Sequence, residues 1–194
     1  AWGIPYIATM LGLKQVYPGR YDPELLVGLW QKEKVTFSHC VPTILQMLLN
    51  AKAAQGVDFN GWKLIIGGSA LNRSLFLAAK EKGMRLSTAY GMSETGPIIS
   101  GAYLNDAAVA GSEDQRTASL LKAGVPVPLV QARILDAEGK SLAHDGVAQG
   151  ELVLRAPWLT MAYFNEPQKS AELWEGGWLH TGDMAKMDEQ GYFY

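Results

Sequence analysis

The sequence has little of what marks a disulfide scaffold, a membrane protein or a nucleic-acid-binding protein. Its single cysteine, Cys40, excludes an internal disulfide and fits a reducing compartment, so we expect a cytoplasmic protein. No uninterrupted apolar run reaches the ~18 residues of a membrane span, and no signal peptide is recognisable. The net charge of -2 includes no excess of Lys and Arg that would indicate a nucleic-acid or anionic-membrane partner.

What is present suits a packed globular protein. Of 194 residues, 48% are hydrophobic and 19% are charged, which provides a core for one substantial domain or two small ones. The apolar residues from 37 to 49 favour a buried Cys40 thiol over a reactive one. The chain begins with Ala rather than Met, so we expect a piece of a longer protein.

The first third reads as alternating helices and a strand. Asp22-Pro23-Glu24 is a strong helix start, because Asp can cap the helix and Pro fits its first turn. Apolar residues alternate from 35 to 41, which predicts a short strand, and Pro42 opens another helix. His39 therefore lies at a strand end, where a structural and a catalytic role both stay open.

A βαβ unit follows. Residues 63–66 form an apolar strand that runs into Gly67-Gly68-Ser69-Ala70, and a helix over about 72–82 leads to a strand over 85–90. Two strands joined by a helix are parallel, and ligands bind at the carboxyl ends of such strands. We therefore expect Gly67 to Ala70 and Tyr90 to Thr95 to face one crevice.

The second half changes character. Residues 101–124 read as a loop-rich link, and short alternating segments with turns follow over 130–134, 151–155, 184–187 and 192–194. The predicted fold class is α/β: half of a mostly parallel sheet with flanking helices, then a small antiparallel sheet or barrel. We place the subdomains at 1–118 and 119–194.

Three common signatures are absent from the sequence. There is no G-x-x-x-x-G-K-[ST] phosphate loop and no G-x-G-x-x-G dinucleotide fingerprint. The segment Gly91-Met92-Ser93-Glu94-Thr95-Gly96 places its second Gly one residue too late for a G-x-S-x-G nucleophile elbow. These absences weaken a hydrolase interpretation.

A nucleotide site built from small residues remains. Gly67 and Gly68 would let a flat heterocycle approach the backbone, and the Tyr90 ring would stack on it. Glu94 is a hard oxygen ligand of the kind that Mg²⁺ accepts, and the Thr95 hydroxyl is a phosphate donor. Near the end, Asp183 follows Gly182 and suits the two hydroxyls of a ribose, although an ordinary turn residue would look the same.

Four segments together resemble the AMP-forming acyl-CoA synthetase and adenylate-forming family. They are Tyr90-Gly91-Met92-Ser93-Glu94-Thr95, Gly150-Glu151 followed by Tyr163, Trp178-Leu179-His180-Thr181-Gly182-Asp183, and the Gly67 to Ala70 loop. Their order and spacing agree with the family over essentially the whole chain. The opening Ala1-Trp2-Gly3-Ile4-Pro5-Tyr6 is most similar to the fatty-acyl branch, in which a Trp near this point gates the acyl tunnel.

The resemblance implies ATP-dependent adenylation of a carboxylic acid, followed by thioester formation with CoA. It implies adenine contacts at Gly67, Gly68, Ser69, Ala70 and Tyr90, and further nucleotide contacts at Ala89, Gly91 and Met92. It also implies an α-phosphate contact at Thr95, Mg²⁺ at Glu94, ribose at Asp183, and the acid at Trp2, Gly91, Met92, Pro97 and Ile98. Thr95 and Glu94 would be the catalytic pair.

The sequence departs from the family pattern in what it does not contain. The Gly-rich phosphate loop ending in Pro-Lys, the His-containing motif, the Asp-Arg hinge and the lid with the adenylating Lys are absent from these 194 residues. We therefore expect the chain alone to be inactive. An aryl or amino acid substrate, an α/β hydrolase, a non-catalytic binding module and a homodimer stay open.

Overall fold

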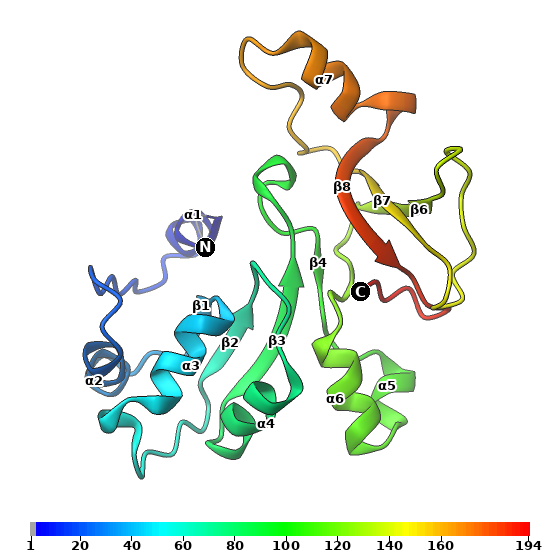
Figure 1. Ribbon diagram of the computed structural model, residues 1–194. Helices are drawn as coiled ribbons and strands as arrows, with labels where there is room; N and C mark the ends of the chain where they lie inside the picture. The colour runs from blue at the N-terminus through cyan, green and yellow to red at the C-terminus, as the bar shows by residue number, and fades with distance from the viewer. Residues whose placement is uncertain (1–2) are drawn as a thin grey trace. The chain divides into compact units, whose positions relative to one another are not determined.

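The structure is a computed structural model that describes residues 3–194 (Figure 1). Trp2, to which the family resemblance gives a contact with the acid, lies outside the described residues. The chain divides into two compact units, residues 1–89 and residues 90–194, which are described one at a time. Across residues 3–194, every helix is too short or too polar to span a bilayer.

Unit 1 is built on parallel strands, as the βαβ pattern predicts. Phe37 lies opposite Lys63, and Lys63 lies opposite Arg85, so neighbouring strands start in register. The carboxyl ends of the three strands consequently meet at one edge of the sheet. The strands are β1 (Phe37–Cys40), β2 (Lys63–Ile66) and β3 (Arg85–Tyr90), and α4 (Arg73–Glu81) joins the last two.

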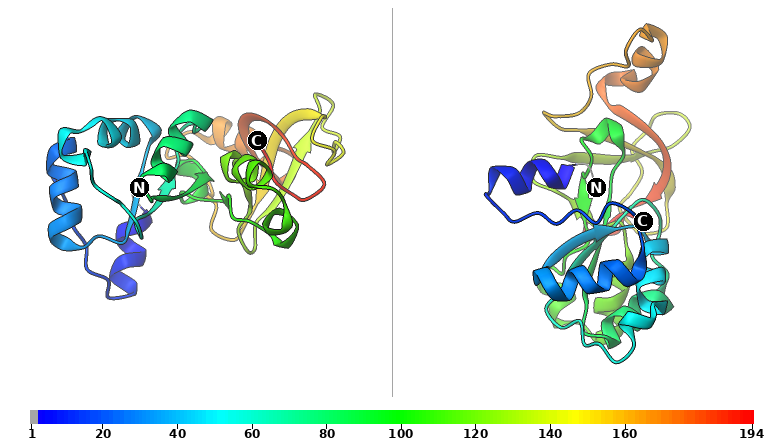
Figure 2. Two further views of the ribbon diagram at one scale, coloured as in Figure 1. Left: turned by 90° about the horizontal axis from the view of Figure 1, so that it is seen from below. Right: turned by 90° about the vertical axis from the view of Figure 1, so that its left-hand side faces the viewer.

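Helix α2 (Pro23–Glu33) of unit 1 begins at a capping residue. The Asp22 carboxylate accepts a hydrogen bond from the Leu25 N–H at 2.9 Å, and Pro23 occupies the first turn of α2. Helix α3 packs against both α2 and α4, and Figures 1 and 2 show α3 and α4 on the same side of the strands. The remaining elements are α1 (Gly3–Met10), α2 (Pro23–Glu33), α3 (Pro42–Asn50) and η1 (Lys52–Ala54).

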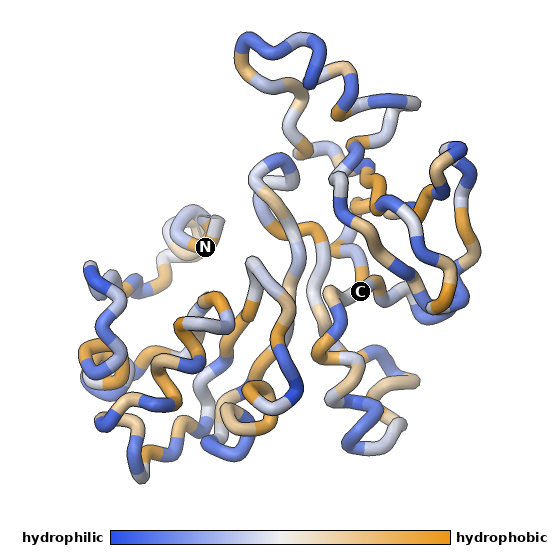
Figure 3. The backbone as a smooth tube through the Cα atoms, viewed as in Figure 1, coloured by the Kyte–Doolittle hydropathy of each residue, from blue (hydrophilic) through white to orange (hydrophobic). Residues whose placement is uncertain are grey.

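The apolar segments of the strands and helices supply the core of unit 1 (Figure 3). An aromatic group extends this core, with the ring centroids of Trp30 and Phe59 4.8 Å apart and those of Phe59 and Trp62 5.5 Å apart. The fully buried large side chains of this unit are Val27, Leu45, Phe59, Leu64 and Ile66.

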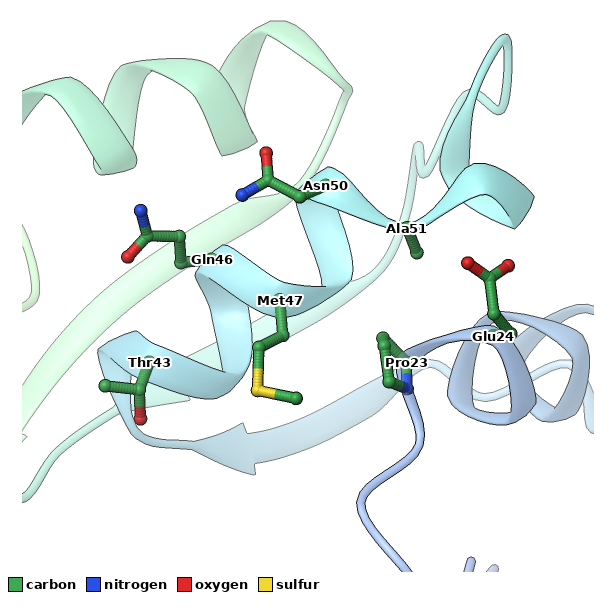
Figure 4. A pocket seen from close by; sticks show the side chains of 7 residues that line it. All are labelled: Pro23, Glu24, Thr43, Gln46, Met47, Asn50 and Ala51. Carbon is green, nitrogen blue, oxygen red and sulfur yellow. The ribbon is translucent and has the colours of Figure 1, made fainter.

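A shallow groove separates α2 from α3 (Figure 4). The Glu24 carboxylate at its edge accepts hydrogen bonds from the Lys52 and Ala53 N–H groups at 2.8 and 2.7 Å. Glu24 therefore satisfies the first two N–H groups of η1. None of the predicted site residues lines this groove.

Unit 2 contains two helices where a loop-rich link was expected, and that expectation is wrong. Asn105 accepts a hydrogen bond from Ala108 N–H at 2.8 Å and starts α5 (Asp106–Ala110). Ser112 and Gln115 form a reciprocal capping box that starts α6 (Glu113–Leu121). The glycines that suggested a loop punctuate these short helices, because Gly111 lies between the two.

The predicted antiparallel sheet of unit 2 is confirmed. Strand β7 (Gln149–Arg155) lies between β6 (Gln131–Leu135) and β8 (Leu179–Lys186), antiparallel to both. The strand order is β1-β2-β3-β4-β5 in the first sheet and β6-β7-β8 in the second. The other elements are η2 (Ser93–Thr95), β4 (Ser100–Gly101), β5 (Val125–Pro126), α7 (Pro167–Leu173) and η3 (Glu175–Gly177).

One face of this antiparallel sheet covers the core of unit 2. Alternate residues of β7 point into it, so Leu152 and Leu154 are buried beside Ile134 and Leu179. Phe193, after β8, closes the cluster and meets the edge of the Tyr90 ring at a centroid distance of 6.1 Å. The core thus fixes the base of Tyr90, the last residue of β3.

Candidate functional site

The Gly-rich loop of unit 1 follows β2 directly, as predicted. A Cβ on Gly67 would lie 3.2 Å from the Ala89 carbonyl oxygen and 3.3 Å from His39 Nε2, so this position has room for little more than glycine. Gly68 has a φ of +82°. Gly68, Ser69 and Ala70 are exposed, which leaves backbone and small side chains open to a flat ligand.

The end of β1 carries two groups affected by burial. His39 Nδ1 is buried without a hydrogen-bond partner among residues 3–194, and desolvation lowers the pKa of the imidazole. Burial raises the pKa of the Cys40 thiol to about 12. Cys40 is partly buried, and as a protonated thiol at neutral pH it agrees with the unreactive interpretation.

The loop from Gly91 to Ile98 is folded tightly on itself. A Cβ on Gly91 would lie 1.6 Å from the Pro97 carbonyl oxygen, so Gly91 packs directly on the Pro97 backbone. Thr95 is fully buried, and its hydroxyl lies 2.9 Å from the Met92 N–H, the Met92 carbonyl and the Pro97 carbonyl. The structure thus brings the predicted acid-binding residues Gly91, Met92, Pro97 and Ile98 together, and it uses the Thr95 hydroxyl inside the loop.

Tyr90 and Asp183 meet in unit 2. The Tyr90 hydroxyl donates a hydrogen bond to Asp183 Oδ2. Burial raises the pKa of Tyr90, and the bond to the Asp183 carboxylate raises it further. Asp183 is exposed on β8, so a carboxylate with spare acceptor capacity faces solvent beside a neutral phenol.

Glu94 is held by a segment whose role sequence reasoning missed. The Tyr163 hydroxyl donates to Glu94 Oε1 at 2.8 Å, which raises the pKa of Tyr163. The Thr160 N–H donates to the Glu94 carbonyl at 2.9 Å, and Trp158 Nε1 donates to the Thr95 carbonyl at 3.1 Å. Residues 158–163 therefore fix both the backbone and the carboxylate of η2.

The donor set around Glu94 suits a metal that is shared with a substrate. Residues 3–194 contain no group of three or more His, Cys, Asp and Glu side chains that would form a complete protein cage. Tyr163 uses one Glu94 oxygen, and the other has no protein partner in the described chain. One carboxylate completed by water and phosphate oxygens is a usual Mg²⁺ arrangement, so the residues fit the ion.

Tyr163 appeared in the sequence analysis only as part of a motif, and Trp158 did not appear at all. Tyr163 lies 69 residues from Glu94, and Trp158 lies 63 residues from Thr95. No local periodicity links positions so far apart. Aromatic residues with a polar tip in a loop were the only available signal.

The chain is similar in sequence to a known protein family and to characterised enzymes. A family described as AMP-binding enzyme matches residues 1–164. The chain is 38% identical over 195 residues to a long-chain-fatty-acid–CoA ligase of Thermus thermophilus, covering 99% of the chain and 36% of that protein. It is 37% identical to a 3-methylmercaptopropionyl-CoA ligase of Ruegeria lacuscaerulensis, with the same two coverages. The chain thus spans about a third of the length of these relatives.

Solved structures share the fold. The N-terminal domain of FACL13 from Mycobacterium tuberculosis superposes with a TM-score of 0.83 at 22% identity, covering 96% of this chain and 45% of that one. An anthranilate CoA ligase, AuaEII, solved in complex with anthranoyl-AMP, gives a TM-score of 0.76 at 23% identity over 92% of this chain and 33% of its own. These likenesses support the α/β architecture.

Proposed function

The chain belongs to the AMP-binding enzyme family, and from this premise we propose that it is part of an ATP-dependent acyl-CoA ligase acting on a fatty acid. The observation that carries the proposal is the arrangement of unit 2. There, the Asp183 carboxylate accepts a hydrogen bond from the Tyr90 hydroxyl, and the Glu94 carboxylate accepts one from the Tyr163 hydroxyl. The 38% identity to the Thermus ligase supports the fatty-acid assignment.

The nucleotide assignments follow from what each group offers. We assign adenine to the loop from the buried Gly67 to the exposed Gly68, Ser69 and Ala70 and to the face of the Tyr90 ring, with Ala89 as a further nucleotide contact. Asp183 accepts the ribose hydroxyls with the lone pairs that Tyr90 leaves free. We also propose that the Thr95 hydroxyl donates to the α-phosphate. To do so, it would have to give up one of its present hydrogen bonds to a backbone carbonyl.

The reaction consists of two transfers. An oxygen of the acid carboxylate attacks the α-phosphorus of ATP, the new O–P bond forms and pyrophosphate leaves. The CoA thiol then attacks the acyl carbon, its proton is released and AMP leaves with the C–O bonding electrons. Gly91, Met92, Pro97 and Ile98 would hold the acid for both steps, and positioning supplies a large share of such catalysis.

Mg²⁺ bound at Glu94 would supply Lewis-acid neutralisation of the phosphate oxygens. Tyr163 holds Glu94 Oε1 at 2.8 Å, so the other oxygen has a fixed direction. The backbone bond from Thr160 to Glu94 prevents the loop from turning away. These contacts keep the carboxylate in place before any nucleotide arrives.

The test is acid-dependent pyrophosphate release by the full-length protein, with kcat/KM measured for a series of straight-chain, sulfur-containing and aromatic acids. A fatty acid should give the highest value. The 37% identity to the 3-methylmercaptopropionyl-CoA ligase makes a short sulfur-containing acid the second candidate. No acid-dependent release would contradict adenylation itself, and fluorophosphonate labelling of Ser69 or Ser93 would support a hydrolase instead.

The polypeptide of residues 1–194 should by itself form little or no acyl-adenylate. Its sequence contains no Gly-rich loop ending in Pro-Lys and no lid lysine of the kind the family pattern includes. One preorganised group acting on developing charge is commonly worth ~3 to 4 kcal/mol. Robust ATP–pyrophosphate exchange by the purified polypeptide would contradict this. The homodimer and the cytoplasmic location stay predictions.

A further inference from the structure

Glu151, in the middle of β7, uses both carboxylate oxygens on β8. Its Oε2 lies 2.9 Å from His180 Nδ1, and its Oε1 accepts a hydrogen bond from the Gly182 N–H at 3.0 Å. The two partners flank Thr181 in the sequence. The Glu151 side chain therefore holds in place the part of β8 that directly precedes Asp183.

This stretch is an irregularity in the sheet. Glu151 pairs with Met184 and Val153 pairs with His180, so one residue of β7 faces three residues of β8. A bulge leaves its extra residues without ladder partners, and Gly182 has a φ of +73°. The exposed Asp183 carboxylate is the side chain that this bulge presents.

Side-chain bonds take the place of the missing ladder bonds. The Thr181 hydroxyl donates to the Leu152 carbonyl at 2.7 Å and accepts from the Asp183 N–H at 3.1 Å. The Gly182 N–H has the Glu151 carboxylate as its acceptor. Without Glu151, this N–H and the His180 ring would both lose their partner on β7, and the bulge would be free to change shape.

We propose that Glu151 is the positioning residue that sets the Asp183 carboxylate for the ribose of the bound nucleotide. The inference rests on the proposed function, in which Asp183 binds ribose. A carboxylate suits the task because it accepts from two donors at once, whereas the amide of Gln has one oxygen and one NH₂. Glu151→Gln can therefore preserve one of the two bonds, and Glu151→Ala preserves neither.

A residue that merely stabilises the sheet would behave differently from a positioning residue. Loss of general stability lowers the melting temperature but does not change the preference of the folded protein for a nucleotide with ribose hydroxyls. Loss of positioning lowers the preference for a nucleotide with ribose hydroxyls over one without them. The ratio of the dissociation constants for 2′,3′-dideoxy-AMP and AMP measures that preference directly.

The experiment is titration calorimetry of the full-length protein with AMP and with 2′,3′-dideoxy-AMP. Wild type should prefer AMP by about 10- to 100-fold, because hydrogen bonds to a charged group are the strong ones. Glu151→Ala should lower this ratio about tenfold, with Glu151→Gln in between. Ile134→Val, a core change on β6 that removes none of the hydrogen bonds of the bulge, should leave the ratio unchanged.

A double-mutant cycle with Asp183→Ala shows whether Glu151 acts through Asp183. In the Asp183→Ala background, Glu151→Gln should have no further effect on the ratio. A wild-type ratio in the folded Glu151→Gln and Glu151→Ala proteins, or additive losses in the cycle, would overturn the inference alone. If Glu151→Ala does not fold, Glu151→Gln decides. Absence of AMP binding by wild type would instead overturn the proposed function and the inference with it.

Discussion

The hydroxyl of Tyr90 donates a hydrogen bond to the carboxylate of Asp183, 93 residues further along the chain. The bond joins the end of β3 to the bulge of β8, and it gives Asp183 a fixed neutral donor. The carboxylate retains lone pairs for two further donors. Under the proposed function, this pair binds a ligand that combines a flat ring with neighbouring hydroxyls.

Removal of the Tyr90 hydroxyl should weaken AMP binding while the ring remains. We expect Tyr90→Phe to raise the AMP dissociation constant about fivefold, the effect of losing one hydrogen bond worth ~1 kcal/mol. Tyr90→Ala should cost more, because it also removes the ring. Titration calorimetry measures both, and equal affinities for wild type and Tyr90→Phe would show that the bond does not orient Asp183.

The Tyr90 phenol should lose its proton at a higher pH than an ordinary tyrosine does. Burial and Asp183 raise its pKa in the folded state. A raised pKa favours the protonated form, so the stability that this group contributes is complete below the ordinary tyrosine pKa and is lost as the pH rises through the folded pKa. In a spectroscopic titration at 295 nm, wild type should show one more late-ionising tyrosine than Tyr90→Phe. Identical curves would contradict the assignment.

Glu94→Gln should raise the Mg²⁺ concentration that half-saturates pyrophosphate release by about tenfold or more, because a neutral amide is a poorer ligand for a hard cation. Tyr163→Phe is the matched control, since it keeps the carboxylate and removes only its 2.8 Å partner. We expect a smaller rise in this variant. If Glu94→Gln leaves the Mg²⁺ dependence unchanged, the metal assignment fails.

Gly91→Ala should disrupt the loop. The new methyl group would lie 1.6 Å from the Pro97 carbonyl oxygen, a distance that requires the backbone to move. We expect a loss of about 3 kcal/mol or more in the free energy of unfolding, measured by denaturant titration.

Gly28→Ala is the control for this change. Gly28 lies inside α2, and a Cβ there would meet no atom within 4 Å. Ala in a helix interior is favoured over Gly by roughly 0.5–1 kcal/mol, so this variant should be at least as stable as wild type. Similar losses in both variants would contradict the tight loop.

Cys40 should react slowly with Ellman's reagent in the native protein. Burial raises its pKa to about 12, so the thiolate is scarce near pH 8. The rate should be on the order of a thousandfold lower than in denaturant and should rise with pH toward the raised pKa. A native rate equal to the denatured rate would show an accessible thiolate.

Local signals in the sequence determined the elements that depend on local physics. Asp22 and Pro23 fixed the start of α2, and alternating apolar residues indicated the strands of both sheets. The βαβ pattern determined the parallel pairing of β2 and β3. The helices over 106–121 were missed, because glycines and short length outweighed the capping signals at Asn105 and Ser112.

By itself, the sequence determined the chemistry available at Tyr90, Glu94 and Asp183 and the order of their motifs. Only the tertiary structure decided that Asp183 meets the Tyr90 hydroxyl, that Tyr163 holds Glu94, and that Glu151 ties the bulge on β8. The physical reason is the separation along the chain over which each kind of interaction acts. Capping and alternation act between residues a few positions apart, whereas these bonds depend on the packing that brings distant segments together.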